Sequence, residues 1–233
     1  MLIWALRYGQ GLLALSKQAP PEGWSERIPW VEHVCDMSSQ NNGASGGASG
    51  GLPAEDRLNV FALVIYIPDP LGQFLDDLRR ELVPAYKPCA HVSVLPPRPL
   101  AVDWRLASVQ LRELAEVWRP FDIELTEISV FPVTDVIYLE LGTGAEELRE
   151  MHTAMASKSL AFEEPFAYYP HVTLAQEIPH ERVEELRDKA RRLWREYQGP
   201  RRFRATQAVF VQSTMSNCWI DLAEYSLGLA VVR

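Results

Sequence analysis

Regular patterns of apolar and polar residues begin near residue 58. Residues 59–67 form an apolar run that stops at Pro68, which is typical of a buried strand. Five apolar residues then recur at helical spacing and predict an amphipathic helix over about 71–82. The same patterns predict three further elements before Pro132: a strand at 91–95, a helix at about 103–118 and a strand at about 121–131.

The order of elements then repeats. The predicted elements are a strand at 136–141, a helix at about 145–160, a strand at 171–175, a helix at about 180–197 and a strand at about 202–212. A final strand is expected at 217–223. Because the order strand, helix, strand, helix, strand occurs twice with similar spacing, we predict an α+β fold made by duplication, with two lobes related by a pseudo-two-fold axis.

The central strand of each copy carries the same pattern of histidine, apolar, hydroxyl, apolar. The two stretches are His91-Val92-Ser93-Val94 and His171-Val172-Thr173-Leu174. Side chains alternate between the faces of a strand, so each histidine shares a face with its hydroxyl while the apolar residues enter the core. The pattern does not follow the other three histidines, His33, His152 and His180. We therefore expect the two histidines and two hydroxyls to converge on one cleft.

Two histidines, each beside a hydroxyl, suit phosphoryl chemistry without a metal ion. Imidazole titrates near pH ~6.5, so one ring can take a proton while the other donates one. Ser93 and Thr173 can donate hydrogen bonds to phosphate oxygens, where negative charge gathers in the transition state. The alternative interpretation, a satisfied core histidine, is common for a lone histidine but does not account for two matched copies.

Composition and charge argue against several classes of protein. The chain has 233 residues and a net charge of −8, which argues against a general nucleic-acid coat protein. The three cysteines, Cys35, Cys89 and Cys218, are far apart, which indicates a reducing compartment and no CxxC metal site. No apolar run approaches the ~20 residues of a membrane span. We expect a cytoplasmic monomer with no membrane partner.

The first 55 residues differ from the rest of the chain. Residues 38–51 form a Gly/Ser-rich linker that cannot build a core, and Met37 stands directly before it. We hypothesise that Met37 is the true start; the alternative is that residues 1–36 contain a short helix or strand that docks on the main domain. The expected organisation is a disordered extension and linker over 1–55, one functional domain over 56–225 and a tail over 226–233.

Residues 58–223 resemble the 2H phosphoesterase superfamily, which includes 2′-5′ RNA ligase-like proteins and cyclic phosphodiesterases. The signature of that superfamily is two His-apolar-Ser/Thr-apolar motifs about 80 residues apart, and here His91 and His171 are 80 residues apart. Phe131-Pro132, followed by the apolar run 136–139, resembles the central segment of the superfamily. The resemblance implies a bilobed fold in which two antiparallel sheets line a central cleft and helices lie outside.

The resemblance also implies metal-independent opening of 2′,3′-cyclic phosphates at RNA ends or in nucleotides, with no cofactor. It implies that His91 and His171 act as acid and base, and that Ser93 and Thr173 bind the phosphate. The pseudo-symmetry does not distinguish the two histidines; we favour His171 as the base and His91 as the acid. Three alternatives stay open: 2′-5′ RNA ligation, which is the reverse reaction, a non-catalytic RNA- or nucleotide-binding module, and an enzyme for another phosphoester or an acyl substrate.

Other residues are weaker candidates for substrate contacts. Many RNA-acting members carry a basic residue where Gln176 stands, and Arg98 could supply that charge or be a solvated loop residue. Tyr86 and Tyr168 precede the two motifs and could stack nucleobases or fill the core. The arginine-rich residues 187–204 could track an RNA backbone or form a solvated helix face.

Overall fold

A computed structural model describes residues 56–228, except residues 86 and 88, and these belong to one compact unit. The predicted extension 1–55, with the proposed start at Met37, lies outside the described residues, as do Tyr86 and residues 229–233. Within the described part of the chain, no helix combines the length and apolar character needed to cross a membrane.

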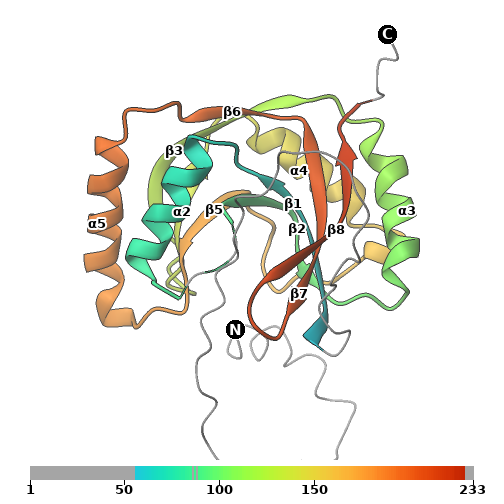
Figure 1. The fold of residues 1–233 in the computed structure, drawn as a ribbon, viewed down its shortest axis with the longest axis horizontal. Coiled ribbons are helices and arrows are strands. Elements are labelled where there is room, and N and C mark those ends of the chain that lie inside the picture. The colour runs from blue at the N-terminus through green and yellow to red at the C-terminus, as the bar shows by residue number, and fades with distance from the viewer. Residues whose placement is uncertain (1–55, 86, 88, 229–233) are drawn as a thin grey trace, which may run out of the picture. The chain divides into compact units, whose positions relative to one another are not determined.

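The helices and strands follow the predicted order (Figure 1). The helices are α2 (Leu71–Leu82), α3 (Trp104–Ala115), α4 (Ala145–Met155) and α5 (Val183–Glu196), with short 3-10 helices η3 (Lys158–Leu160) and η4 (His180–Arg182). The strands are β1 (Arg57–Tyr66), β2 (His91–Arg98), β3 (Phe121–Val130), β4 (Ile137–Leu141), β5 (His171–Ala175), β6 (Arg202–Ala205), β7 (Gln207–Thr214) and β8 (Trp219–Ser226). The first repeat therefore runs from β1 to β3, and the second begins at β4.

The predicted strand over 202–212 is wrong, because this segment forms two strands in two different sheets. β6 pairs with β3, whereas β7 pairs with β1. The chain passes from one sheet to the other at Thr206, between the two strands. The polar residues Thr206 and Gln207 interrupt the apolar pattern here, but two polar residues do not indicate that the chain changes sheet.

Each of the two sheets has four antiparallel strands, in the orders β2-β1-β7-β8 and β5-β4-β3-β6. Both orders start with a motif strand at the edge, continue with the strand before it in the sequence, and then add the last strand of the other repeat. The two repeats thus exchange β3 and β7. The predicted duplicated α+β fold of two antiparallel sheets is confirmed, with the refinement that each lobe contains strands from both repeats.

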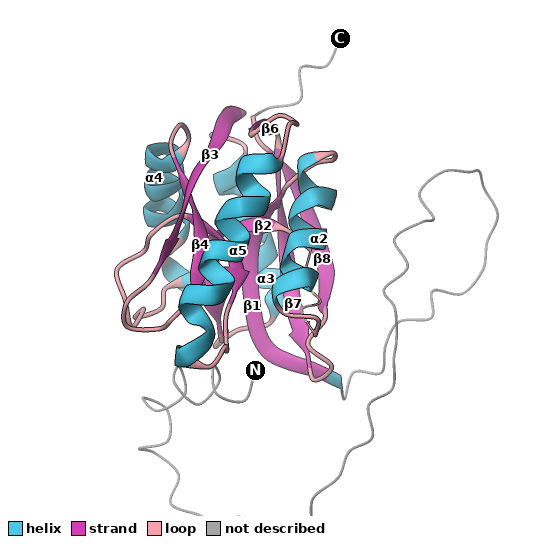
Figure 2. Cartoon of the chain, turned by 90° about the vertical axis from the view of Figure 1, so that its left-hand side faces the viewer, coloured by secondary structure: helices cyan, strands magenta, loops and turns pink. Residues whose placement is uncertain are grey.

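The helices lie outside the sheets, and α2 and α4 each cover the sheet that contains the motif strand of the other repeat. α2 contacts β5 and α5 contacts β3, so both cover the second sheet, as Figure 2 shows with these two helices in front of the strands. α4 contacts β2 and α3 contacts β8, so both cover the first sheet (Figure 1). Each motif strand is therefore supported by a helix from the other repeat.

Single residues at the N-termini of α3 and α4 explain where these two helices begin. The Asp103 side chain caps α3 by accepting a hydrogen bond from the backbone N–H of Arg105 at 2.8 Å. Gly144 precedes α4 with φ of 89°, and a Cβ at this position would lie 2.6 Å from the carbonyl oxygen of Asp122. Glycine is thus required where the second repeat turns from β4 into its helix.

The apolar residues of the motifs anchor both motif strands in the core. Val92 and Val94 of β2, and Val172 and Leu174 of β5, are fully buried in the main apolar cluster between the sheets and the helices. The burial of alternate residues directs the intervening histidines and hydroxyls to the opposite face of each strand. The hydrophobic pattern thereby fixes which face of each strand carries the polar groups.

Candidate active site

The two motif strands lie against each other at the edges of their sheets. His91 and Ser93 of β2, and His171 and Thr173 of β5, are all half-buried. His91 is close enough to His171 for the charge of one ring to act on the pKa of the other. The structure therefore brings together the four residues of the two predicted half-sites.

Each motif histidine makes the same backbone contact. Nδ1 of His91 lies 2.6 Å from the carbonyl oxygen of Cys89, and Nδ1 of His171 lies 2.7 Å from that of Tyr169. A carbonyl oxygen can only accept, so Nδ1 donates in both cases. In the neutral ring Nε2 then carries the lone pair, which means that both histidines present a proton-accepting nitrogen of the same type.

The motif hydroxyls are not engaged by the protein side chains around them. Among residues 56–228 other than 86 and 88, neither Ser93 Oγ nor Thr173 Oγ1 makes a hydrogen bond. Each hydroxyl stands two residues after a histidine on the same strand face. Both O–H groups can therefore donate to a ligand that also contacts the two imidazoles.

Aromatic rings pack against both imidazoles. The ring of Trp219 lies 4.7 Å from that of His91, measured between centroids. Phe131 and Tyr138 stack on each other and approach His171 edge-on, at 5.0 and 5.4 Å. These contacts fix the ring orientations and shield the imidazoles from water.

Burial lowers the pKa of both motif histidines, because it disfavours the charged ring. For His91, burial, then the positive charge of Arg79, and then that of His171 together lower the pKa to about 3, against the opposing effect of the hydrogen bond to Cys89. For His171, burial lowers the pKa and the hydrogen bond to Tyr169 acts in the opposite direction. Both rings are therefore neutral in the free protein at pH 7, and a bound anion is needed to favour a protonated imidazole.

The residues directly across from the two histidines differ. Tyr66 of β1 pairs with His91, and its hydroxyl donates to a carboxylate oxygen of Asp221 at 2.7 Å. Glu140 of β4 pairs with His171 and accepts a hydrogen bond from Ser129 at 2.5 Å. The two histidines are thus equivalent in their backbone contacts, whereas the residues paired with them on the neighbouring strands, Tyr66 and Glu140, differ.

The prediction that Arg98 binds a substrate phosphate is not supported by its position, at the end of β2. Arg98 is only 2% exposed and forms an ion pair with Glu164. Its guanidinium also donates to the carbonyl oxygens of Pro96 and Leu160, both at 3.0 Å. The sequence shows an arginine after two prolines and suggests a loop, whereas the strand continues through the prolines and draws the side chain into the interior.

Tyr168 also has a different setting from the predicted one. One face of its ring stacks on His152 at 3.9 Å with an interplanar angle of 2°, and its hydroxyl donates to the carbonyl oxygen of Ser93 at 2.7 Å. A nucleobase cannot occupy the face that His152 covers. The second predicted stacking residue, Tyr86, lies outside the described residues.

The basic run 187–204 is largely engaged by the protein itself. Its cations pair with carboxylates or donate to backbone carbonyls: Arg187 with Glu184 and Asp188, Lys189 with Glu81, Arg191 with Ile128, Arg201 with Trp194, and Arg202 and Arg204 with Asp122. These contacts favour the solvated-face interpretation of the run over an RNA track.

Local sequence does not identify three residues around the site. Trp219 contacts His91 from β8, Arg79 acts on the pKa of His91 from α2, and His152 reaches β2 from α4. None of them stands beside a motif in the sequence. Among the described residues, the side chains of His, Cys, Asp and Glu form no group of three or more that could hold a metal ion.

Comparisons with known proteins agree with this architecture. The family model of the 2′-5′ RNA ligase superfamily matches residues 67–217, which include both motifs. A candidate phosphoesterase of Bacillus licheniformis is 30% identical over 121 residues, which cover 51% of this chain and 71% of that protein. A second one, from Oceanobacillus iheyensis, is 28% identical over 78 residues, which cover 33% of this chain and 45% of that protein.

Solved structures of LigT from E. coli share the fold. The complex with 3′-AMP has a TM-score of 0.53 and 15% identity, and the alignment covers 73% of this chain and 99% of LigT. The complex with ATP has a TM-score of 0.52 and 14% identity over the same shares of the two chains. At this level of identity, the comparison supports the arrangement of the two sheets and says nothing of the substrate.

Proposed function

This chain belongs to the 2′-5′ RNA ligase superfamily, the 2H phosphoesterases, and we propose that it opens 2′,3′-cyclic phosphates of nucleotides or RNA ends by acid–base catalysis without a metal ion. The observation that carries this proposal is the matched pair of histidines. Each Nδ1 donates to a carbonyl oxygen two residues earlier, so each Nε2 can accept or donate the proton that moves in the reaction.

The proposed reaction needs one base and one acid. Nε2 of the base takes a proton from water as the water oxygen bonds to phosphorus. The bond between phosphorus and the 3′ oxygen breaks, and Nε2 of the acid gives that oxygen its proton, which leaves a 2′-phosphate and a 3′-hydroxyl. Ser93 and Thr173 donate to the non-bridging oxygens as charge builds on them.

We assign His91 as the base and His171 as the acid, which reverses the order favoured from the sequence. Arg79 places a positive charge near His91 and adds to the effect of burial there, whereas burial is the cause that lowers the pKa of His171. Both rings are unprotonated before the substrate binds, and the positive charge of Arg79 holds His91 in this proton-accepting form, which suits the base. A bound phosphate raises the pKa of both rings and allows His171 to hold the proton that it donates.

We further propose that the substrate is short, such as a cyclic nucleotide or an RNA end. Most cations of 187–204 are engaged with protein carboxylates and carbonyls, so few are left to follow a long phosphate backbone. Substrate affinity should then fall only weakly with salt concentration, with the slope expected for one or two phosphate contacts. A steep decline would point to an extended RNA surface.

The test is hydrolysis of 2′,3′-cyclic nucleotides and of RNA with a cyclic-phosphate end, in the presence of EDTA. We expect turnover of both classes, with a 2′-phosphate as the product. Binding of these ligands without turnover would instead favour a non-catalytic binding module. Joining of a cyclic-phosphate end to a 5′-hydroxyl end under the same conditions would reveal the reverse reaction.

A further inference from the structure

The backbone of the first motif strand is held by side chains from the second repeat. β2 is an edge strand, and its register with β1 shifts at Val94, so some of its carbonyl groups lack a partner on a neighbouring strand. Tyr168 donates to the carbonyl oxygen of Ser93 at 2.7 Å, and Nδ1 of His152 lies 2.8 Å from that of Val94. The two contacts fall on Ser93 and Val94, the last two residues of the motif that begins at His91.

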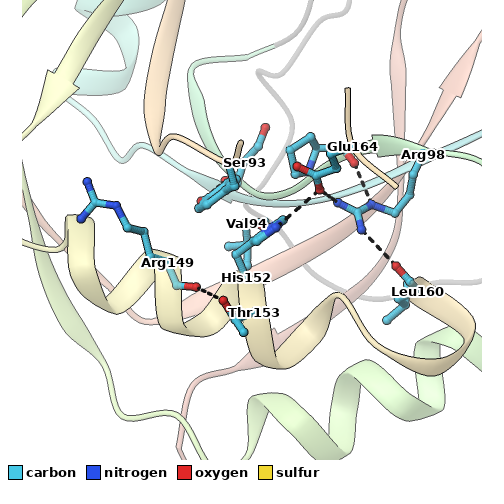
Figure 3. A network of polar contacts seen from close by, with 10 residues as sticks. Ser93, Val94, Arg98, Arg149, His152, Thr153, Leu160 and Glu164 are labelled. Carbon is cyan, nitrogen blue, oxygen red and sulfur yellow. Dashed lines mark hydrogen bonds and ion pairs between the residues drawn. The ribbon is translucent and has the colours of Figure 1, made fainter. Parts of the chain in front are cut away.

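These two side chains support each other. Their rings are parallel and 3.9 Å apart, so neither can turn without breaking the stack. Nε2 of His152 lies 3.5 Å from the Glu164 carboxylate, which is ion-paired with the buried Arg98 (Figure 3). Burial raises the pKa of the Tyr168 hydroxyl, which therefore stays a donor at neutral pH.

Tyr168 is also tied to the other half of the site. It stands three residues before His171, on the segment that leads into β5. The side chain of Tyr168 bonds to the backbone of Ser93, while its own backbone continues directly into the second motif. A single residue therefore spans the two motif strands.

We propose that Tyr168 and His152 are positioning residues, which set the placement of His91 and Ser93 relative to His171 and Thr173. This inference rests on the proposed function for its kinetic consequence. In-line displacement requires base and acid on opposite sides of one phosphorus atom, and a misplacement of about 1 Å can lower the rate by up to ~10²-fold. Turnover needs base and acid in line at the same moment, whereas binding sums the separate contacts to the phosphate, so we expect KM to depend less on this spacing than kcat does.

Tyr168→Phe is the first test, because it keeps the ring stack and removes only the hydrogen bond to Ser93. We expect kcat on a 2′,3′-cyclic nucleotide to fall about ten-fold, with KM within about two-fold. The matched control is Tyr225→Phe, which removes another buried tyrosine hydrogen bond, to Ser108 Oγ at 2.8 Å, remote from both motifs in sequence. It should lower the urea midpoint to a similar extent and leave kcat unchanged.

Equal kcat values for Tyr168→Phe and Tyr225→Phe would overturn the inference, as would a loss of kcat that follows only the unfolded fraction. The second test uses His152. The amide nitrogen of asparagine stands at the same position along the side chain as Nδ1 and can donate to the carbonyl oxygen of Val94, whereas leucine cannot. We expect His152→Asn to retain more kcat than His152→Leu when both are compared at equal folded fraction; equal kcat values would contradict a positioning role.

A readout without turnover separates this inference from the proposed function. If the wild-type protein does not hydrolyse cyclic phosphates, the proposed function fails, and imidazole NMR then decides the inference. Tyr168→Phe should shift the ring resonances and the titration of His91, and Tyr225→Phe should not. Unchanged His91 signals in Tyr168→Phe would refute the positioning role whatever the reaction is.

Discussion

Replacing Arg98 with methionine removes a buried cation that three protein groups surround. The guanidinium pairs with Glu164 and donates to the carbonyl oxygens of Pro96 and Leu160. Methionine fills a similar volume without charge or donors. The substitution thus leaves the carboxylate without its main partner and two carbonyl groups short of a donor.

The expected destabilisation follows from this loss. Removing one partner of a buried ion pair costs about 3–5 kcal/mol. The Glu164 side chain is 14% exposed, so water offsets part of that cost. We therefore expect about 3 kcal/mol, which is compatible with folding because domains are stable by about 5–15 kcal/mol.

Urea unfolding monitored by tryptophan fluorescence measures this loss. With a urea m-value of about 2 kcal/mol/M, the midpoint of Arg98→Met should fall by about 1.5 M. Arg195→Met is the matched control, because Arg195 is exposed on α5, and its midpoint should stay within about 0.3 M. In a double-mutant cycle, Arg98→Met and Glu164→Gln should be less than additive, since both remove the same pair.

The outcome that refutes the structural role of Arg98 is specific. If Arg98→Met keeps the wild-type midpoint while KM for a cyclic nucleotide rises ten-fold or more, then the arginine reaches the substrate and the sequence-based prediction is restored. Additive effects of the Arg98 and Glu164 substitutions would also contradict a tight pair. A lowered midpoint with KM within about three-fold supports the buried position.

His91→Ala and His171→Ala should each lower kcat by about 10²–10⁴-fold in EDTA, and a loss of only a few-fold in either contradicts the two-histidine scheme. Ser93→Ala and Thr173→Ala should each lower kcat/KM by about 10²-fold, since each removes a donor to the transition state; wild-type values would exclude the hydroxyls from the reaction. Because burial lowers the pKa of both histidines, kcat/KM should follow a bell with its optimum below pH ~6.5, and a rate that rises steadily to about pH 9 argues against it. The pKa of His91 is about 3 in the folded protein and about 6.5 in the unfolded chain, so the unfolded chain binds more protons between these values. The free energy of unfolding should therefore fall as pH drops from about 6.5 toward 3. His91→Asn should lose less stability over that window in urea titrations, and parallel curves would count against the lowered pKa.

Local patterns in the sequence predicted the order of the elements and the four residues of the paired motifs. α2 and β5 occupy the predicted ranges, because the apolar spacing that forms them lies within each segment. The alternation in both motifs also fixed the shared strand face of each histidine and hydroxyl. The two matched copies at equivalent places in a repeat predicted that the half-sites meet, and β2 and β5 do lie against each other.

Long-range packing places the groups that surround those four residues. The break at Thr206 reflects the exchange of strands between the repeats, and sheet membership depends on partners that local periodicity does not encode. Arg98 meets Glu164 across 66 residues, Tyr168 meets Ser93 across 75, and His152 meets Val94 across 58. Such contacts form only when α4 and the segment before β5 pack on β2, so the arginine, the tyrosine and the third histidine acquire their roles from the fold and not from their neighbours in the chain.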